Sequence, residues 1–357
     1  MTMNVSDKNF ARDFSPAWFA SVMGTGILAS TSMSYATLIP VLGTLASALW
    51  VFNTALFLLL LFFWLMRWLR YPQNAIKDLG HPVNSQFYPT MPIGFIVVAG
   101  NFLQIGKNYL PSSFILAVAS VFWVIGSMVT LLFAFILTYR FFIGSAMKPE
   151  QINPSWFIPP VALIILPLIG GQIMQQWPAA WQEPIVVFNF ICWSSGFFLY
   201  LFLSAIALFR LIIHDPLPPQ LLPTLWINLG PIGAGVMALL VMAKSSSAII
   251  QLPLSSINAF GFIWWAFGIW WFLMSAIMTI RYISCGTLPY AMSWWAFIFP
   301  LGAYVGASYM LYTVYAMKSI YWIGFALYLV LLFLWIITSW KTILNLTKGG
   351  AAGPAKG

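Results

Sequence analysis

The sequence predicts an all-α membrane protein of ten transmembrane helices, arranged as five helical hairpins in a quasi-fivefold ring around a central pore. Three observations predict this fold: the composition, ten apolar runs, and Gly- and Pro-rich motifs that recur every 67 to 71 residues. Hydrophobic residues make up 62% of the 357 residues and charged residues 6%, whereas soluble domains carry about 25% charged residues. Lipid is therefore the expected solvent, and helices satisfy their backbone polar groups there.

Ten apolar runs follow one another, each long enough to cross a hydrocarbon core about 30 Å thick. The predicted spans are 15–35, 38–66, 89–106, 112–142, 154–176, 184–213, 220–243, 257–282, 288–313 and 319–345. Even-numbered spans are long and continuous, whereas odd-numbered spans are shorter and interrupted by Gly and Pro. The predicted organisation is a cytoplasmic N-terminus at 1–14, a transmembrane channel domain at 15–345 and a disordered C-terminal tail at 346–357.

The interruptions of the odd-numbered spans recur with a regular period. Markers at Thr25, Ile93, Pro160, Pro231 and Pro300 are separated by 68, 67, 71 and 69 residues. Such a period predicts five copies of one hairpin, each an interrupted helix followed by a continuous one. The residues at these predicted helix breaks are Gly24, Thr25, Gly26, Pro92, Gly94, Pro159, Pro160, Gly230, Pro231 and Pro300.

Proline inside a helix removes a backbone hydrogen bond and costs about 3 kcal/mol. In a bilayer the freed carbonyl is tolerated only where protein or a water-filled cavity covers it. The interrupted helices are therefore expected to face inward and line a central pathway, with the continuous helices in an outer ring facing lipid. The alternative is that these Gly and Pro residues only adjust helix packing, as small residues do in many membrane bundles.

The Lys and Arg residues predict the orientation, because cytoplasmic loops are enriched in them. With the N-terminus inside, twelve lie on the cytoplasmic side and three outside. The cytoplasmic set is Lys8, Arg12, Arg67, Arg70, Lys77, Arg140, Lys148, Arg210, Arg281, Lys341, Lys348 and Lys356, and the external set is Lys107, Lys244 and Lys318. This predicts a multi-pass protein of the plasma (inner) membrane with both termini in the cytoplasm. Scattered charges also argue against nucleic acid as a partner.

The spans carry little reactive chemistry. All six acidic residues lie in predicted loops or at span ends, and there is no His, Cys and acid cluster with metal-ligand spacing. We therefore expect no metal, no cofactor and no catalytic residue. His81 and His214 are either solvated loop histidines or pH sensors. Cys192 and Cys285 are expected to be packing residues without a disulfide.

The absence of buried acids also indicates the permeant species. Cation pathways normally carry acidic rings or a carbonyl-rich filter, and neither is visible. The N-terminal ends of interrupted helices would add positive potential inside the pore, which favours anions modestly. A proton-coupled carrier would need a titratable residue in the pathway, and the odd-numbered spans show none.

Several motifs together resemble a known family. They are Phe14-Ser15-Pro16-Ala17-Trp18-Phe19 with Met23-Gly24-Thr25-Gly26, His81-Pro82 before Met91-Pro92, Gly230-Pro231, and Trp294-Trp295-Ala296-Phe297-Ile298-Phe299-Pro300. In order and spacing they are similar to the tellurite-resistance/dicarboxylate transporter family, which includes bacterial TehA proteins, fungal malate and sulphite permeases and plant slow anion channels. The resemblance covers about residues 15 to 345. It implies ten helices in five hairpins around a pore, and a homotrimer.

The resemblance also implies a phenylalanine from the ninth span that plugs the pore, and the matching residue is Phe299. From the sequence alone, packing between helices is the favoured role for this side chain, and the family resemblance reverses that preference. The leading hypothesis is a passive channel for small anions across the bilayer, gated by Phe299. The alternative is a proton-coupled C4-dicarboxylate (malate) or sulphite transporter. Chloride, nitrate, malate, sulphite and tellurite all remain open as the permeant anion.

Overall fold

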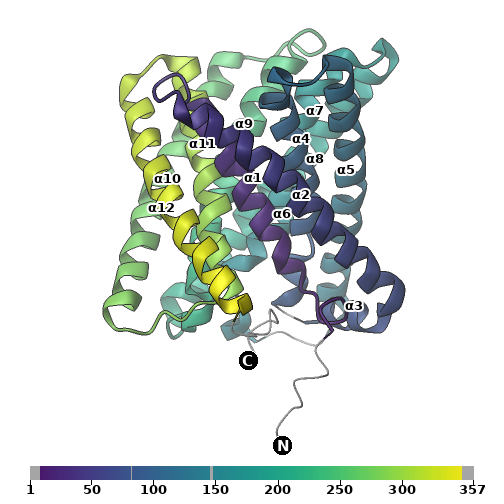
Figure 1. The fold of residues 1–357 in the computed structure, drawn as a ribbon. Coiled ribbons are helices and arrows are strands. Elements are labelled where there is room, and N and C mark those ends of the chain that lie inside the picture. Colours follow the sequence, from purple (N-terminus) through teal and green to yellow (C-terminus); the bar gives the residue numbers. More distant parts are fainter. Residues whose placement is uncertain (1–8, 82, 145–147, 348–357) are drawn as a thin grey trace, which may run out of the picture.

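The computed structural model describes residues 9–81, 83–144 and 148–347. The expectations for residues 1–8 and for 348–357, including Lys8, Lys348 and Lys356, lie outside the described residues. Within the described ranges the chain forms helices and no strand, so the all-α prediction is confirmed. Figure 1 shows these helices running side by side between two ends of the molecule.

Long and short helices alternate along the chain. The long helices are α2 (Val41–Arg70), α5 (Ser112–Ile143), α8 (Ala179–Ile213), α10 (Leu254–Ser284) and α12 (Lys318–Thr347). The shorter helices are α1 (Phe19–Ser34), α4 (Thr90–Gln104), α6 (Ile158–Ile164) with α7 (Leu166–Ile173), α9 (Leu229–Ser246) and α11 (Ile298–Tyr315), and α3 (Pro72–Asp78) follows α2. Nine helical stretches of the described residues are long and apolar enough to cross a membrane. The first predicted span, which the 3-10 segment Pro16–Trp18 and α1 occupy, is not among them.

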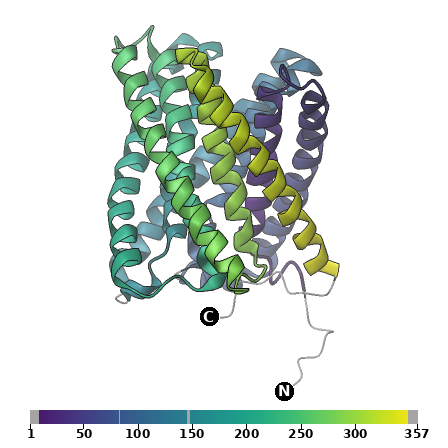
Figure 2. The same ribbon diagram turned by 90° about the vertical axis from the view of Figure 1, so that its left-hand side faces the viewer.

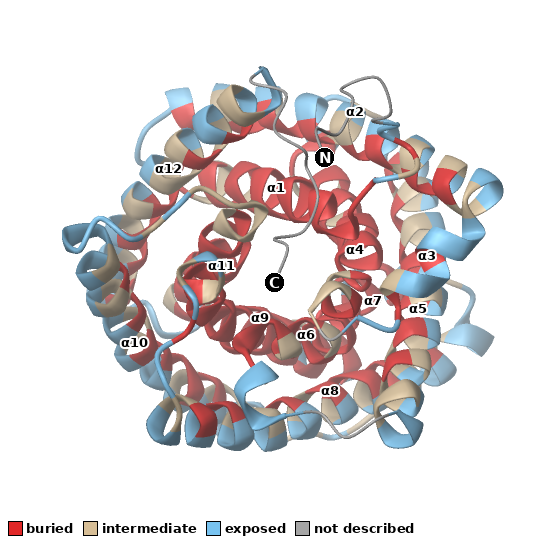
Figure 3. Cartoon of the chain, turned by 90° about the horizontal axis from the view of Figure 1, so that it is seen from below, coloured by how far each residue is buried: buried red, intermediate tan, exposed pale blue. Residues whose placement is uncertain are grey.

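The helices form two concentric rings. Viewed along the bundle in Figure 3, α1, α4, α6, α7, α9 and α11 form an inner ring, and α2, α5, α8, α10 and α12 form an outer ring. Within the most apolar window of each spanning stretch, 67–94% of inner residues are buried but only 22–33% of outer residues. The outer ring presents large apolar side chains such as Phe135 and Phe142 to its surroundings. Such a surface fits a hydrocarbon environment.

Side-chain hydrogen bonds, here called the inter-ring bonds, join each outer helix to the inner segment that follows it in the chain, and join the last outer helix to α1. Their donors recur along the chain at intervals of 70, 70, 72 and 70 residues. The bonds are Asn53 to Asn101 Oδ1 (3.5 Å), Trp123 to the Leu166 carbonyl (3.0 Å), Trp193 to the Gly235 carbonyl (3.0 Å), Trp265 to Ser308 Oγ (2.8 Å) and Trp335 to Thr25 Oγ1 (3.1 Å). The last bond joins α12 to α1, so the set closes on itself. Figure 2 shows α12, in yellow, crossing the side of the bundle obliquely.

Each inner segment begins as a 3-10 helix and then becomes an α-helix. The 3-10 segments are Pro16–Trp18, Asn84–Phe87, Pro154–Phe157, Pro219–Asn228 and Met292–Phe297. Pro92, Pro159, Pro160, Pro231 and Pro300 each lie at the second or third position of the α-helix that follows. A first-turn residue has no intrahelical partner for its N–H, so proline is accommodated there without losing a hydrogen bond.

This arrangement differs from the expected mid-helix interruptions. The prolines mark the change from 3-10 to α geometry near one end of each inner segment, and no carbonyl in the middle of the helix is freed by them. The motif Gly24-Thr25-Gly26 lies within α1, which continues through it to Ser34. One inner segment is interrupted: α6 ends at Ile164 and α7 begins at Leu166, with Ile165 between them. Pro167 is the second residue of α7.

Candidate functional site

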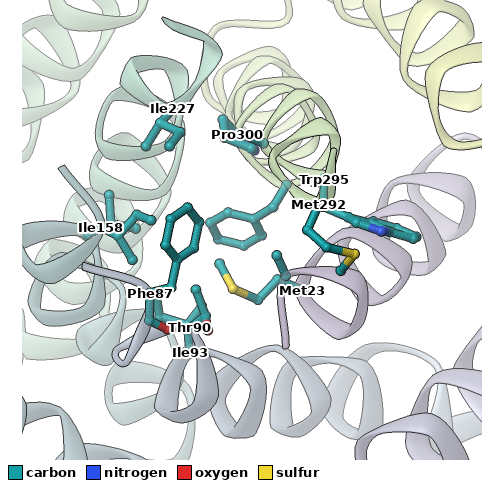
Figure 4. A pocket seen from close by; sticks show the side chains of 14 residues that line it. Met23, Phe87, Thr90, Ile93, Ile158, Ile227, Met292, Trp295 and Pro300 are labelled. Atoms are coloured by element: carbon teal, nitrogen blue, oxygen red, sulfur yellow. Dashed lines mark hydrogen bonds between the residues drawn. The ribbon is translucent and has the colours of Figure 1, made fainter. Parts of the chain in front are cut away.

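A cavity of about 440 Å³ lies where the inner segments begin. All members of the inner ring except α7 contribute to its wall, together with the end of the 3-10 segment before α4. The lining residues are Ala20, Met23, Phe87, Thr90, Ile93, Ile158, Val161, Ile227, Gly230, Met292, Trp295, Ala296, Phe299 and Pro300. Figure 4 shows Met23, Phe87 and Ile158 pointing into it from different elements. We call it the first cavity.

A second cavity of about 360 Å³ lies further along the same helices. Its lining residues are Ile27, Ser30, Ile96, Val97, Gly100, Ile165, Leu168, Ile169, Met237, Phe299 and Ala303. On α1, Ala20 and Met23 line the first cavity, whereas Ile27 and Ser30 line the second. Residues three and four apart share one helix face, so both cavities lie against the same face of α1.

The same order holds around the inner ring. In α4, in α6 and α7, in α9 and in α11, the residues that line the second cavity follow those that line the first. The inner helices are therefore parallel, with their N-terminal ends at the first cavity, and the two cavities are stacked along the axis that these helices surround. These two stacked cavities are the main candidate for the functional site.

Phe299 is the residue that the two described cavity walls share. It is the second residue of α11 and is 4% exposed. Its near neighbour Phe297 instead contacts the rings of Trp226 and Trp294, with centroid distances of 5.4 and 5.8 Å. Phe299 thus lies between the cavities, and Phe297 packs among aromatic side chains.

The walls of both cavities are mainly apolar. In the first cavity, the Thr90 hydroxyl lies within hydrogen-bond distance of the Pro16 and Phe87 carbonyls, at 2.8 and 2.6 Å. Trp295 directs its indole N–H to Thr342 Oγ1 of α12 at 3.2 Å. The polar side chain on the second wall is Ser30. No Asp, Glu, Lys, Arg or His lines either cavity in the described part of the chain.

Three of the residues singled out in the sequence lie on the wall of the first cavity: Phe299, Gly230 and Pro300. A Cβ added at Gly230 would be 3.7 Å from both Pro300 and Val161, which are also wall residues.

The other motif residues contact neighbouring helices. Thr25 accepts the Trp335 bond, and a Cβ at Gly24 would meet Trp295 and Ile298 at 3.0 Å. Gly26 faces α4, and Gly94 faces the rings of Phe57 and Phe19. The carbonyls of Pro92 and Pro160 lie against Gly126 of α5 and Gly196 of α8. Pro231 is buried and Pro159 half-buried, away from both cavities.

Several wall residues were not among the predicted pore-lining residues, notably Met23, Phe87 and Ser30. Met23 and Ser30 carry a usable signal, since they lie three residues before and four after Gly26 on one helix. Phe87 carries none, because it ends a 3-10 segment outside the predicted span.

Charged groups gather beyond the pathway, at the ends of the outer helices. Buried Arg67 donates to the Phe14 carbonyl and pairs with Asp78, and Arg210 donates to the Asp215 carbonyl at 2.9 Å. His214 Nδ1 lies 3.5 Å from Glu150 Oε1. In the other histidine-bearing loop, His81 Nδ1 accepts the N–H groups of Val83 and Asn84. Neither histidine lines a cavity.

Thr342 ties the beginning of the α11 segment to α12. Besides the Trp295 indole, Thr342 Oγ1 lies 2.8 Å from the Tyr290 hydroxyl. The Tyr290 hydroxyl is the donor of this bond, since a phenol is protonated at neutral pH. These two contacts hold the segment that leads into Phe299.

Comparisons with known proteins identify the family of the chain. Residues 13–343 match the family SLAC1, described as voltage-dependent anion channels. The chain is 43% identical over 343 residues to an uncharacterized transporter of Methanocaldococcus jannaschii, covering 96% of this chain and 97% of that protein. It is 25% identical to the sulfite efflux pump SSU1 of Arthroderma benhamiae, covering 83% and 81% of the two chains. It is 22% identical to the malic acid transport protein of Schizosaccharomyces pombe, covering 91% and 77%. The chain is therefore a multi-pass integral membrane protein that belongs to the voltage-dependent anion channel family.

Proposed function

We propose that this protein is a passive channel for small anions in which the Phe299 side chain is the gate. The observation that carries the proposal is that Phe299 separates two cavities stacked along one axis. A narrow apolar constriction excludes water and so blocks ions without binding them. Displacing this ring would join the cavities into one path.

The electrostatics of the inner ring favour anions. Each helix N-terminus carries roughly half a positive elementary charge, and the inner helices α1, α4, α6, α9 and α11 all begin near the first cavity. No carboxylate on the described walls opposes this potential or would attract cations. Because no Lys or Arg lines the cavities either, anions would bind weakly and leave readily, as conduction requires.

A proton-coupled transporter of C4-dicarboxylates or sulphite is the second candidate. The names of two relatives, a malic acid transport protein and a sulfite efflux pump, support it. Against it stands the composition of the two described walls, which contain no carboxyl or imidazole group to carry a proton. The channel is therefore the better-supported function.

The same proposal includes the topology. The inner and outer rings fit five hairpins around a pore within each protomer, with ten membrane-crossing segments and both termini in the cytoplasm of a plasma (inner) membrane. We further propose a homotrimer, since the outer helices offer broad apolar faces to neighbouring copies. Native mass measurement in mild detergent should give three chains, and only monomers under every mild condition would contradict the assembly.

Flux into liposomes tests the function directly. Parent protein and Phe299→Ala are reconstituted, and chloride, nitrate and malate fluxes are measured with and without an imposed pH gradient. We expect each flux to follow the electrochemical gradient of the anion, to be larger in Phe299→Ala, and to give no accumulation when only a pH gradient is supplied. Uphill malate uptake driven by protons would instead establish the coupled transporter.

A further inference from the structure

One of the inter-ring bonds differs from the others in its donor, and its residues lie next to the second cavity. At four positions of the set the donor is a tryptophan indole, but on α2 it is Asn53. Its acceptor, Asn101 of α4, in turn contacts Ser30, which lines the second cavity. We propose that Ser30 donates a hydrogen bond to the permeating anion in the second cavity, and that Asn101 and Asn53 are positioning residues. This inference rests on the proposed channel function.

The hydrogen bonds of Asn101 determine the orientation of its amide. Asn101 Nδ2 lies 2.9 Å from the Gly26 carbonyl and 2.8 Å from Ser30 Oγ. A carbonyl only accepts, so the atom facing Gly26 must be the amide nitrogen. Asn101 Oδ1 then faces Asn53, whose Nδ2 donates to it. Both asparagines are fully buried, so water does not compete for these groups.

The same contacts direct the Ser30 hydroxyl hydrogen towards the cavity. Hydroxyls elsewhere on α1 donate to a carbonyl one turn earlier, as Thr31 does to Ile27 and Ser34 to Ser30. For Ser30 that carbonyl belongs to Gly26, which already accepts from Asn101. Ser30 Oγ accepts the second Asn101 hydrogen and donates to no group in the described chain. Its hydrogen is therefore free for a ligand in the second cavity.

Packing alone does not account for this arrangement. A tryptophan joins the rings at the other positions of the set, whereas two buried amides join them here, packed closely against Gly26. A Cβ at Gly26 would lie 2.6 Å from Asn53 Nδ2 and 2.9 Å from Asn101 Oδ1. Asn53 Oδ1 is buried without a partner in the described structure, which is costly for a group that serves only to fill space.

A neutral hydrogen-bond donor in the apolar second cavity suits a small inorganic anion that is partly dehydrated. One directed O–H replaces a lost water, and it helps a strongly hydrated anion such as chloride more than a weakly hydrated one such as nitrate. Because the donor carries no charge, the anion is not trapped. Ser30 is thus expected to set the ratio of chloride to nitrate permeability.

Reversal potentials in planar bilayers measure that ratio independently of the amount of protein. In a Phe299→Ala background, Ser30→Ala should lower the chloride-to-nitrate permeability ratio roughly three- to tenfold, the equivalent of one hydrogen bond. Ser30→Thr, which keeps the hydroxyl, should retain the ratio. Asn101→Leu should lower it, and adding Ser30→Ala to Asn101→Leu should lower it little further.

Ser21→Ala is the matched control, because Ser21 lies on the same helix and donates to the Trp18 carbonyl at 2.7 Å, away from both cavities. The chloride-to-nitrate permeability ratio of this variant should equal that of the Phe299→Ala background. Anion current with an unchanged ratio in Ser30→Ala would overturn this inference and leave the channel intact. Absence of anion current from every variant, including the parent, would reject the proposed function and the role of Ser30 with it.

Discussion

Phe297 and Phe299 show how strongly the role of a residue depends on its direction. Two steps along a helix turn the side chain by about 200°, so these two rings leave α11 and its 3-10 segment on nearly opposite sides. Phe297 is 2% exposed and is enclosed by tryptophans, and Phe299 is 4% exposed yet lies between two cavities. Burial alone does not distinguish them, but their neighbours do.

Alanine substitutions at these two positions should therefore have different effects. Phe299→Ala should fold normally, because the ring borders empty space on two sides, and it should carry a much larger anion current than the parent. Phe297→Ala should lose about 3 to 5 kcal/mol of stability, the usual cost of a deleted core aromatic ring, without a gain in current. Thermal unfolding in detergent and bilayer recording measure the two effects. A well-folded Phe299→Ala protein with parental current would exclude the gate.

Gly233 provides a test of inner-ring packing. A Cβ at this position would lie 2.4 Å from the backbone of Ala303 and Tyr304, and backbone atoms cannot rotate away. Gly233→Ala should therefore separate α9 from α11 and destabilise the protein by about 1 to 3 kcal/mol or more.

Gly261→Ala in α10 is the control for that substitution, since its nearest neighbours would be side-chain atoms at 3.6 and 3.7 Å. It should be neutral or stabilising by up to about 1 kcal/mol, because alanine favours the helix. Melting temperatures compare the two variants, and equal values would show that α9 and α11 are not in backbone contact.

At the scale of helices, the inter-ring bonds join segments that apolar packing alone would hold loosely. Lipid removes most of the hydrophobic drive for helices to associate, so close packing and interhelical hydrogen bonds gain importance. Four of the inter-ring bonds link an outer helix to the inner segment that follows it in sequence. The fifth links α12 to α1, two helices that no loop joins.

Removing the bond that closes the set should weaken the whole bundle. Trp335→Phe keeps most of the ring but deletes the donor to Thr25, and we expect a loss of roughly 0.6 to 1.7 kcal/mol. Trp340→Phe on the same helix is the control, because Trp340 is 61% exposed and makes no hydrogen bond in the described structure. Detergent-resistance or thermal-shift measurements should rank Trp335→Phe below Trp340→Phe. Identical stabilities would show that the bond contributes nothing.

The alternation of long and short helices was predictable because its signals are local. Apolar runs and Gly and Pro motifs lie within each segment, and their period of about 70 residues shows in the chain itself. The position of proline in a first turn was not predictable, since the preceding 3-10 segments have no distinct apolar pattern. The hydrogen bonds of Thr25 and Ser30 were equally unpredictable, because their partners Trp335 and Asn101 lie 310 and 71 residues away.

For the whole molecule, orientation follows from where the basic residues lie. Arg67, Arg140, Arg210, Arg281 and Lys341 all lie near the C-terminal ends of outer helices. Thr342, close to the end of α12, contacts the segment that borders the first cavity. The basic ends and the first cavity are therefore on the same side, and we propose from the positive-inside rule that this side is cytoplasmic.

The native cysteines offer a direct test of that orientation. Cys285 follows α10 and is exposed, whereas Cys192 is buried. A membrane-impermeant maleimide should label Cys285 in inside-out vesicles and leave intact cells unlabelled. In a Cys285→Ala chain, Asn108→Cys at the opposite end of the bundle should show the reverse. Labelling of Cys285 from outside the cell would show that the orientation is the opposite of the proposed one.

The bond between α12 and α1 also has a consequence for biosynthesis. Of the inner helices, α1 leaves the ribosome first, yet its neighbours include α11 and α12, which are translated last. While the intervening helices are being inserted, one side of α1 has no protein partner. Thr25 cannot form its hydrogen bond until Trp335, more than 300 residues downstream, has been synthesised. The nascent bundle is therefore an open arc until translation ends. A ribosome stalled before the final helix would leave α1 exposed to lipid, where membrane quality control can recognise an unfinished chain.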